Sequence, residues 1–338
     1  MWSQPSQVSE SAAPAWLREY AGKTVVVTGA RGFLGGRLVA RLAGTACTIV
    51  RVSRTAQLAM PASEATVRDE TGDLGDPAFW DYLIAGADLI VHLAAQTSAT
   101  AAEADPEADA AANINPIRHL LDSCRQQPHR PAILLAGTVT QTGVPTKWPV
   151  DEDAPDHPVT AYDRHKLMAE RELTEAVSRR SARGATLRLS NLYGPGSPGS
   201  GQDRDVLNRM IRTALRGDPL TVFGPGNWLR DYLFVDDAAD AFLMAGVRAD
   251  HVNGRHYVVG SGAGISIRHA FELVAARVEA ATGRRVPVVT DDSPRQAATI
   301  EQRHFVADSS RLTADTGWRR RWTLADGIDH TIKAYSCA

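Results

Sequence analysis

The first half of the chain alternates short apolar runs with longer amphipathic stretches. Continuous apolar runs are typical of strands that are buried on both faces. Such runs occupy residues 24–28, 48–52, 89–93, 133–135 and 186–189. Apolar residues at helical spacing predict helices between these strands. The helices are predicted at residues 34–42, 77–85, 114–125 and 162–181. Strands that alternate with helices of this length predict an α/β fold with a Rossmann-type, doubly wound parallel sheet.

After residue 190 the pattern changes, because turns rich in glycine and proline separate shorter periodic segments. Turn clusters occupy residues 194–202 and 223–227. Helices are predicted at about 203–216 and 266–281, and a strand is predicted at 286–289. Two short helical stretches complete the chain. This second half is therefore expected to form mainly a smaller domain.

These changes predict how the chain divides. Residues 1–22 are expected to form a polar N-terminal arm that docks through Trp16 and Tyr20. The other two domains are a dinucleotide-binding domain at 23–190 with about 231–262, and a smaller C-terminal substrate-binding domain at 191–230 and 263–338. The ligand site is expected between them.

Composition narrows the possible partners. The chain has 338 residues, of which 43% are apolar and 22% charged, so a packed core and about two domains are expected. A net charge of −2 gives no basic surplus for nucleic acid. No apolar run approaches the roughly 18 residues of a membrane span, and the first residues lack a secretory signal. Three scattered cysteines predict no disulfide framework and no metal site, and a cytoplasmic location is expected.

A glycine-rich segment, TGARGFLG at residues 28–35, joins the first predicted strand to the first predicted helix. Gly29, Gly32 and Gly35 allow the backbone to approach a pyrophosphate, whose charge is met by the helix N-terminus. Turns also use glycine for ordinary steric reasons. The order strand, turn and helix nevertheless favours a dinucleotide site.

The end of the second strand indicates which dinucleotide binds. NAD sites place an acid about twenty residues further on, where it bonds the ribose 2′-hydroxyl. This chain has Ser53 and Arg54 there, and a hydroxyl beside a guanidinium suits the 2′-phosphate of NADP(H). Arg31 is a candidate for a second side of this clamp, whereas Arg54 could instead be a solvated strand-end residue. Asp73 is a candidate for the adenine amino group or for an ordinary helix approach.

Tyr162 and Lys166 share one face at the start of a predicted helix, because residues four apart lie one turn from each other. The Lys166 cation is expected to lower the pKa of the Tyr162 phenol by about one to three units and so to make it a better acid. Thr138 follows the strand at 133–135, which predicts a hydroxyl at the carboxyl edge of the sheet, able to bond the same carbonyl oxygen. A strand-end threonine without a catalytic role is the alternative.

Six motifs together resemble the extended short-chain dehydrogenase/reductase family and, within it, the nucleotide-sugar epimerase/dehydratase branch. They are TGARGFLG, HLAA (92–95), Thr138, Tyr-x-x-x-Lys (162–166), RLSNLYGPG (188–196) and RDYLFVDD (230–237). The resemblance covers about residues 23–335. It implies that Thr138, Tyr162 and Lys166 are catalytic, and that Lys166 also bonds the nicotinamide ribose.

The resemblance also implies two binding sites. The residues implied for the cofactor are Gly29, Arg31, Gly32, Phe33, Leu34, Gly35, Ser53, Arg54, Asp73, Leu74, Leu93, Ala94, Ala95, Tyr162, Lys166 and Leu192. Those implied for the substrate are Thr138, Asn191, Val222, Phe223, Arg230 and Arg303. Arg230 is expected at the diphosphate, and Val222 and Phe223 near the base. For a second phosphate-binding arginine, Arg303 is the first candidate and Arg295 the second.

Two departures from the family pattern narrow the reaction. Val139 and Thr140 stand where 4,6-dehydratases carry an acidic Asp-Glu pair, so the elimination of water lacks its acid. The cysteine of fucose-synthase-like epimerase-reductases, just after the catalytic hydroxyl, is also absent. The expected function is NADPH-dependent reduction of a keto group, at C4 by preference, in a nucleoside-diphosphate deoxysugar, as in natural-product deoxysugar biosynthesis.

There are two alternatives, a second enzyme and a protein of a different class. An NAD-dependent nucleotide-hexose C4-epimerase would retain its cofactor. For such an enzyme an acid is expected at the position of Ser53. A catalytically silent dinucleotide sensor gives no reason for the hydroxyl, tyrosine and lysine to occur together. The family implies a homodimer through helix pairs that include residues 162–181, and no nucleic-acid or membrane partner is expected.

Overall fold

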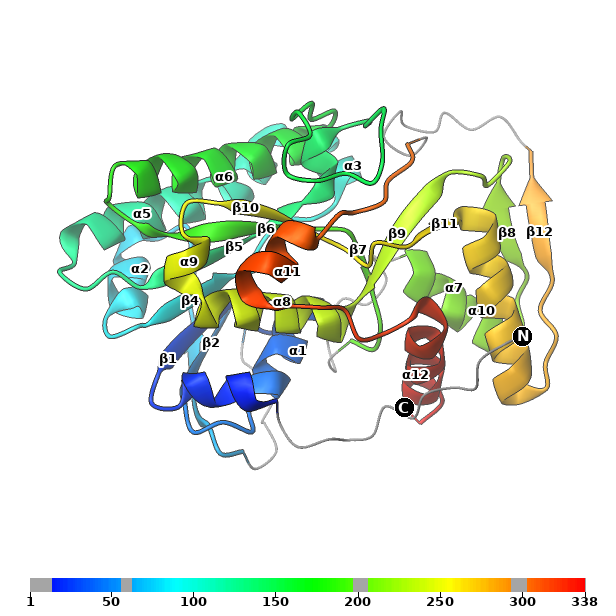
Figure 1. Ribbon diagram of the computed structural model, residues 1–338, viewed down its shortest axis with the longest axis horizontal. Coiled ribbons are helices and arrows are strands. Elements are labelled where there is room, and N and C mark those ends of the chain that lie inside the picture. The colour runs from blue at the N-terminus through cyan, green and yellow to red at the C-terminus, as the bar shows by residue number, and fades with distance from the viewer. Residues whose placement is uncertain (1–13, 56–62, 197–205, 293–302, 338) are drawn as a thin grey trace.

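Seven parallel strands form the central sheet of the computed structural model (Figure 1), which describes residues 14–55, 63–196, 206–292 and 303–337. The strand order is β10-β6-β5-β4-β1-β2-β3, and every neighbouring pair is parallel. The strands are β1 (Thr24–Thr28), β2 (Thr48–Ser53), β3 (Thr66–Thr71), β4 (Leu89–His92), β5 (Ala132–Thr138), β6 (Arg183–Leu189) and β10 (His256–Val259).

Helices cover both faces of this sheet, because successive strand side chains point to opposite sides. Val25 and Val27 of β1 belong to an apolar core with η1, α1 and α8, whereas Val26 belongs to the core on the other face, with α2, α5 and α6. This alternation is the doubly wound α/β architecture that the apolar runs predicted. The helices are η1 (Ala15–Tyr20), α1 (Phe33–Leu42), α2 (Pro77–Ile84), α5 (Asn115–Gln126), α6 (Ala161–Ser178), α8 (Val235–Val247) and the short α9 (Ala249–Val252).

A smaller region follows, with its own apolar core (Figure 1, right). It contains a three-stranded sheet, β11-β9-β7, and a two-stranded sheet, β12-β8, which pack with α7, α10 and α12. Its strands are β7 (Asn191–Tyr193), β8 (Leu220–Phe223), β9 (Leu229–Phe234), β11 (Gly264–Ser266) and β12 (Val288–Asp291). Its helices are α7 (Val206–Arg216), α10 (Ile267–Thr282) and α12 (Leu324–Ser336), and α11 (Ser310–Thr316) packs near α8 and β10.

Each strand and helix predicted in the first half is present, with boundaries shifted by a few residues. The helix predicted to residue 181 ends at Ser178, and Arg180 beyond it has a φ of +57°. The alanine-rich stretch after β4 forms α3 (Ala99–Ala104) and α4 (Pro106–Asn113), which were not predicted because they carry no apolar periodicity. The predicted start of α7, at residues 203–205, lies outside the described residues.

The described part of the N-terminal arm packs on the sheet region. The Tyr20 side chain is buried, and its hydroxyl donates a hydrogen bond of 2.6 Å to the carbonyl oxygen of Leu243. Trp16 packs against the same core. Within the described residues, no helix combines the length and the apolar character that crossing a membrane requires. The domain boundaries and the homodimer stay predictions.

Candidate active site

A cavity of about 2270 Å³ opens where the strands of the central sheet end and extends to the smaller region. The glycine segment after β1 and the carboxyl ends of β2, β4 and β5 line it on one side, and residues of β8, β9 and α10 line it on the other. Parallel strands bring their carboxyl ends to one edge, so residues distant in sequence meet there. Every residue that the sequence assigned to cofactor, substrate or catalysis lines this cavity, except Val222.

Val222 faces away from the cavity, contrary to the prediction that it packs near the base. It is fully buried in the core of the smaller region, whereas its neighbours Thr221 and Phe223 line the cavity. Consecutive side chains of a strand point to opposite faces, so Val222 and Phe223 cannot share this wall. Thr221 is therefore the neighbour that joins Phe223 at the candidate base-binding wall.

The glycine segment leaves room for a ligand at the N-terminus of α1. Gly29 has a φ of +67°, which favours glycine. A Cβ atom on Gly29 would lie 2.9 Å from the backbone nitrogen of Ala94, and one on Gly35 would collide with the carbonyl oxygen of Gly29. The first turn of α1 has no acidic residue and no side-chain cap. Its N–H groups therefore suit an anion such as a pyrophosphate, and these residues fit a dinucleotide.

In the part of the chain that the structure describes, the end of β2 carries a serine and an arginine, and a second arginine reaches it. The Ser53 hydroxyl donates a hydrogen bond to the carbonyl oxygen of Thr55, and Nη1 of Arg31 donates to Oγ1 of Thr55. Arg31 thus reaches from the glycine segment to the residues that follow β2, where Arg54 also lines the cavity. This arrangement has the composition that the sequence predicted for a 2′-phosphate site.

Asp73 lies just after β3, at the cavity wall. Its Oδ1 accepts a hydrogen bond of 2.9 Å from the backbone N–H of Gly75. This bond is the one that an aspartate at a helix approach makes. The contact with an adenine amino group stays a prediction.

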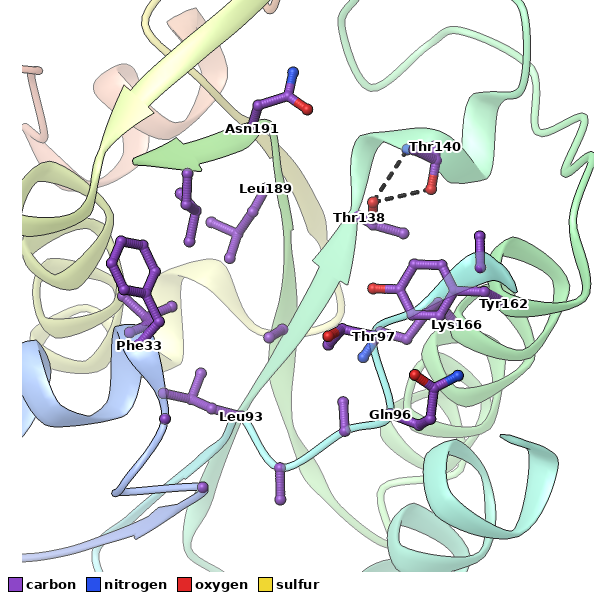
Figure 2. A pocket seen from close by; sticks show the side chains of 18 of the residues that line it. Phe33, Leu93, Gln96, Thr97, Thr138, Thr140, Tyr162, Lys166, Leu189 and Asn191 are labelled. Carbon is purple, nitrogen blue, oxygen red and sulfur yellow. Dashed lines mark hydrogen bonds between the residues drawn. The ribbon is translucent and has the colours of Figure 1, made fainter. Parts of the chain in front are cut away.

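Thr138, Tyr162 and Lys166 lie together on one wall of the cavity, across from Phe33 and Leu93 (Figure 2). Thr138 is the last residue of β5, and Tyr162 and Lys166 lie on the first turns of α6. In Figure 2 the Tyr162 hydroxyl points into the cavity. The structure therefore brings the three residues of the predicted catalytic set to the same wall of the cavity.

A capping box determines where α6 begins. The Thr160 hydroxyl oxygen accepts a hydrogen bond of 3.1 Å from the Asp163 N–H, and Oδ2 of Asp163 accepts one of 3.1 Å from the Thr160 N–H. The pair satisfies N–H groups that the first turn would otherwise leave without partners. The helix start next to Tyr162 is thereby held in place.

A buried network holds the end of β5. The Thr138 N–H donates to Oε1 of Gln141 at 2.9 Å, and Nε2 of Gln141 donates to Oε2 of Glu170 at 3.0 Å. The Arg188 guanidinium, 1% exposed, donates from Nε to Glu170 at 3.0 Å and from Nη1 to Asp156 at 2.7 Å. The backbone of Thr138 is thus fixed through side chains of α6 and β6.

Burial raises the pKa of Tyr162, and the charges of Asp163 and Asp109 raise it further. The expected lowering of this pKa by Lys166 is therefore wrong, because a buried phenolate loses its hydration and two carboxylates oppose its charge. Burial lowers the pKa of Lys166 to about 8, although Asp109 and Glu170 act in the opposite direction. Near neutral pH the phenol keeps its proton and the ammonium its charge, as a proton donor beside a cation requires.

Sequence reasoning missed Asp109, a buried residue of α4 that connects to α6. Its Oδ1 accepts hydrogen bonds from Nε2 of Gln96 at 2.7 Å and from Nδ2 of Asn113 at 3.0 Å. Its Oδ2 lies 2.6 Å from Nδ1 of His165, the residue before Lys166. No local signal marked Asp109, because α4 itself was not predicted. Thr140 and Asp163 line the cavity as well, although the sequence did not assign them to the site.

Two arginines line the cavity on the side of the smaller region. Nη1 of Arg230 donates hydrogen bonds to the carbonyl oxygens of Leu229 at 3.1 Å and Arg303 at 2.6 Å. Arg303 is 5% exposed, and among the described residues its Nε and Nη1 have no hydrogen-bond partner. Burial, and then the charge of Arg230, lower the pKa of Arg303 to about 10. Two neighbouring cations, one of them with unmet donors on Arg303, suit a diphosphate. Arg295 lies outside the described residues.

Asp231 anchors the chain around these arginines. Its Oδ1 accepts a hydrogen bond of 2.7 Å from the N–H of Ser261, and its Oδ2 accepts bonds from Gly262 at 2.9 Å and Ala307 at 3.0 Å. The carboxylate thus ties β9 to two loops that are far away in sequence. In the described part of the chain, no cluster of histidine, cysteine and carboxylate side chains is arranged to hold a metal ion.

Comparison with known families shows which family the chain belongs to. Residues 25–260 match the NAD dependent epimerase/dehydratase family. The chain belongs to this family. The match spans the central sheet, from the second residue of β1 to the end of β10. The resemblance inferred from the six motifs is therefore confirmed.

Curated relatives in this family carry out different reactions on nucleotide sugars. A UDP-glucose 4-epimerase of Mycolicibacterium smegmatis is 28% identical over 92% of this chain and 97% of its own length. A dTDP-6-deoxy-L-talose 4-dehydrogenase (NAD(P)(+)) of Kitasatospora kifunensis is 27% identical over 93% of this chain and 96% of its own length. A dTDP-glucose 4,6-dehydratase of Streptomyces griseus is also 28% identical, so the relatives include epimerases, dehydratases and dehydrogenases.

The fold is shared with solved structures of the family. A UDP-glucose 4-epimerase of Thermotoga maritima, solved with UDP-glucose, has a TM-score of 0.81 and 23% identity over 93% of this chain and 99% of that one. At this level of identity the likeness concerns the fold. The predicted Rossmann-type class is confirmed.

Proposed function

We propose that this chain reduces the C4 keto group of a nucleoside-diphosphate deoxysugar with NADPH. The observation that carries the proposal is that one cavity joins three features. These are a phenol and an ammonium on one wall, a glycine segment near a strand end that carries Ser53 and Arg54 in place of an acid, and two neighbouring arginines. Of these arginines, Arg303 has two donors without a partner among the described residues. The relative named as a 4-dehydrogenase acting with NAD(P)⁺ supports redox chemistry at this position.

The glycine segment and the N-terminus of α1 would hold the pyrophosphate of NADPH. Ser53, Arg54 and Arg31 would hold its 2′-phosphate, because a hydroxyl and planar cations attract a group of nearly two negative charges. When bound, this cofactor supplies the hydride. The Lys166 ammonium lies on the cavity wall, where it would bond the nicotinamide ribose.

Tyr162 acts as the general acid. Its O–H bond breaks as its proton passes to the carbonyl oxygen of the sugar, and the carbonyl carbon receives the hydride, so the product is the alcohol. The Lys166 ammonium stabilises the phenolate that remains on Tyr162. Thr138 lies beside the phenol in Figure 2, where its hydroxyl would contact the C4 hydroxyl that forms. Arg230 and Arg303 hold the diphosphate, which orients the sugar toward the three side chains.

A C4-epimerase is the second candidate, because the relative from Mycolicibacterium smegmatis is a UDP-glucose 4-epimerase. Such an enzyme removes and returns hydride on a retained NAD, for which an acid at the end of β2 is expected. Ser53 occupies that position here. The absence of an acid there favours the reductase.

A panel of nucleoside-diphosphate 4-ketosugars and their 4-hydroxy counterparts tests the proposal. We expect NADPH to be consumed in proportion to ketosugar, as followed by nicotinamide absorbance. Interconversion of hexose epimers without net change in absorbance would establish the epimerase instead. Binding of NADPH without turnover of any member would overturn both enzymatic proposals and leave the silent sensor.

We expect the rate of hydride transfer to fall as the pH rises through about 8, because the Lys166 ammonium loses its proton there. The lowered pKa means that the charge is present below this pH and absent above it. Tyr162 has a raised pKa and keeps its proton over this range, so the loss reports on Lys166. Single-turnover absorbance measures the profile, and Lys166→Arg, whose charge does not titrate, should lack this decline. A wild-type rate that stays level to about pH 10 contradicts the assignment.

Arg303→Met is expected to weaken nucleoside-diphosphate binding by about 1.5 to 3 kcal/mol, the range for hydrogen bonds to a charged group. Because Arg303 is buried beside Arg230, its charge also opposes folding, so methionine should leave the free energy of unfolding equal or higher. Calorimetry with a nucleoside diphosphate and thermal unfolding measure the two effects. NADPH affinity is the control and should not change. Equal diphosphate affinity in variant and wild type would reject the phosphate role.

A further inference from the structure

A chain of three side chains runs along the cavity wall behind the catalytic hydroxyl. Oγ1 of Thr138 lies 3.0 Å from Oγ1 of Thr140, and the Thr140 hydroxyl donates a hydrogen bond to Oδ1 of Asp163. The Thr140 N–H also donates to Oγ1 of Thr138 at 3.3 Å (Figure 2). All three residues line the cavity, and Asp163 is only 1% exposed.

Asp163 acts only as an acceptor in this arrangement. Its Oδ2 takes the Thr160 N–H at the start of α6, and its Oδ1 takes the Thr140 hydroxyl. An ionised carboxylate has no hydrogen to donate. The direction of the Thr140 bond is therefore fixed toward Asp163.

Counting hydrogens then determines the direction of the remaining bond. A threonine hydroxyl carries a single hydrogen, and that of Thr140 is used by Asp163. In the 3.0 Å contact the donor must therefore be Thr138, so its only hydrogen points away from the cavity. We infer that Asp163 is a positioning residue that turns Thr138 into a hydrogen-bond acceptor toward the sugar.

This inference rests on the proposed function and refines the role of Thr138 in it. A keto oxygen only accepts hydrogen bonds, so in the reactant complex it takes its bond from Tyr162 and none from Thr138. Once reduced, the same oxygen carries a hydrogen and donates it to Thr138. This arrangement therefore raises the affinity for a C4 hydroxyl relative to the affinity for a C4 ketone. The reference is a site in which the Thr138 hydroxyl can rotate and donate its hydrogen to the sugar.

Asp163→Asn reverses the chain with almost no change in shape. The asparagine carbonyl continues to accept the Thr160 N–H, so its NH₂ group faces Thr140 and donates to it. The Thr140 hydrogen then passes to Thr138, and the Thr138 hydrogen points into the cavity. Thr138 becomes a donor that suits the ketone and no longer suits the alcohol.

The measurement is the ratio of two dissociation constants, one for a nucleoside-diphosphate 4-keto-6-deoxyhexose and one for the same compound with a C4 hydroxyl. The ketone is paired with NADP⁺ and the alcohol with NADPH, so that neither complex reacts. We expect Asp163→Asn to shift this ratio toward the ketone by about tenfold, the size of about one net hydrogen bond. A folded variant with an unchanged ratio overturns the inference.

Three further variants separate this effect from a structural one. In a Thr138→Val background, Asp163→Asn should change the ratio by less than about twofold, because the hydroxyl that it reorients is gone. Thr140→Val should change the ratio, and Thr140→Ser should restore the wild-type value. An effect of Asp163→Asn that persists without the Thr138 hydroxyl would mean that Asp163 acts through another group.

Neutron diffraction of the deuterated NADP⁺ complex tests the direction without turnover or sugar. We expect the deuterium of Thr138 to lie between Thr138 and Thr140, and the deuterium of Thr140 to lie toward Asp163. A Thr138 deuterium directed into the cavity overturns the inference even if ketosugars are reduced. If the deuterium lies as expected and no ketosugar is reduced, the proposed function fails, whereas the hydrogen-bond direction stands.

Discussion

Tyr162→Phe is expected to lower kcat by at least about a hundredfold, the usual lower range for the loss of a general acid. The phenol lies on the cavity wall beside Lys166 and Thr138, with its hydroxyl directed into the cavity. Burial and two nearby carboxylates keep its proton in place near neutral pH, so the proton is available for transfer. Phenylalanine keeps the ring and its packing and removes only the transferable proton.

Steady-state kinetics with a ketosugar nucleotide measures the loss, and NADPH titration provides the control. NADPH affinity should be nearly unchanged in Tyr162→Phe. Lys166→Met is the comparison variant, because it should lose both rate and cofactor affinity through the phenol and the ribose. Retention of more than about a tenth of wild-type kcat in Tyr162→Phe would remove this residue from the mechanism.

The double substitution Ser53→Asp with Arg54→Ala is expected to abolish or invert the preference for NADPH. Wild type should prefer NADPH over NADH by at least about tenfold in kcat/KM, which corresponds to about 1.4 kcal/mol. The hydroxyl of Ser53 and the guanidinium of Arg54 lie where Arg31 also reaches the end of β2. An aspartate there repels the 2′-phosphate and accepts a bond from a free 2′-hydroxyl.

Kinetics with both cofactors measures this switch. Ser53→Ala with Arg54→Ala is the matched control, because it removes the donors without adding a charge. It should weaken NADPH use without improving NADH use. A wild-type protein that binds NAD more tightly than NADP would show that Arg54 is only a solvated strand-end residue, and the C4-epimerase would become the preferred function.

The sequence by itself determined the features that depend on near neighbours. Continuous apolar runs indicated the strands of the central sheet, and helical spacing indicated the helices that cover it. The strand, glycine segment and helix at residues 24–42 indicated a candidate dinucleotide site. The spacing of Tyr162 and Lys166 placed both on one helix face. Each of these signals is local, because it depends on the geometry of one strand, turn or helix.

Only the tertiary structure decided the features that depend on distant packing. Val222 faces a core that residues from several other elements complete, so its neighbour Thr221 lines the cavity instead. Arg303 is buried, and its backbone carbonyl accepts a hydrogen bond from Arg230, 73 positions earlier in the chain. Its Nε and Nη1 have no partner among the described residues. The alternation of side chains along β8 could not specify which of its two faces would pack against the core of the smaller region and which would line the cavity.

Electrostatics was the property that sequence reasoning judged wrongly. The sequence showed Lys166 one turn from Tyr162 and so predicted a lowered phenol pKa. It did not show Asp109, which reaches this site from α4, or that the fold shields the phenol from water. Charge effects act through space and grow as water is excluded, so they depend on which groups the fold brings together. The sequence thus identified the candidate reacting groups, and the tertiary structure determined the charges and the burial around them.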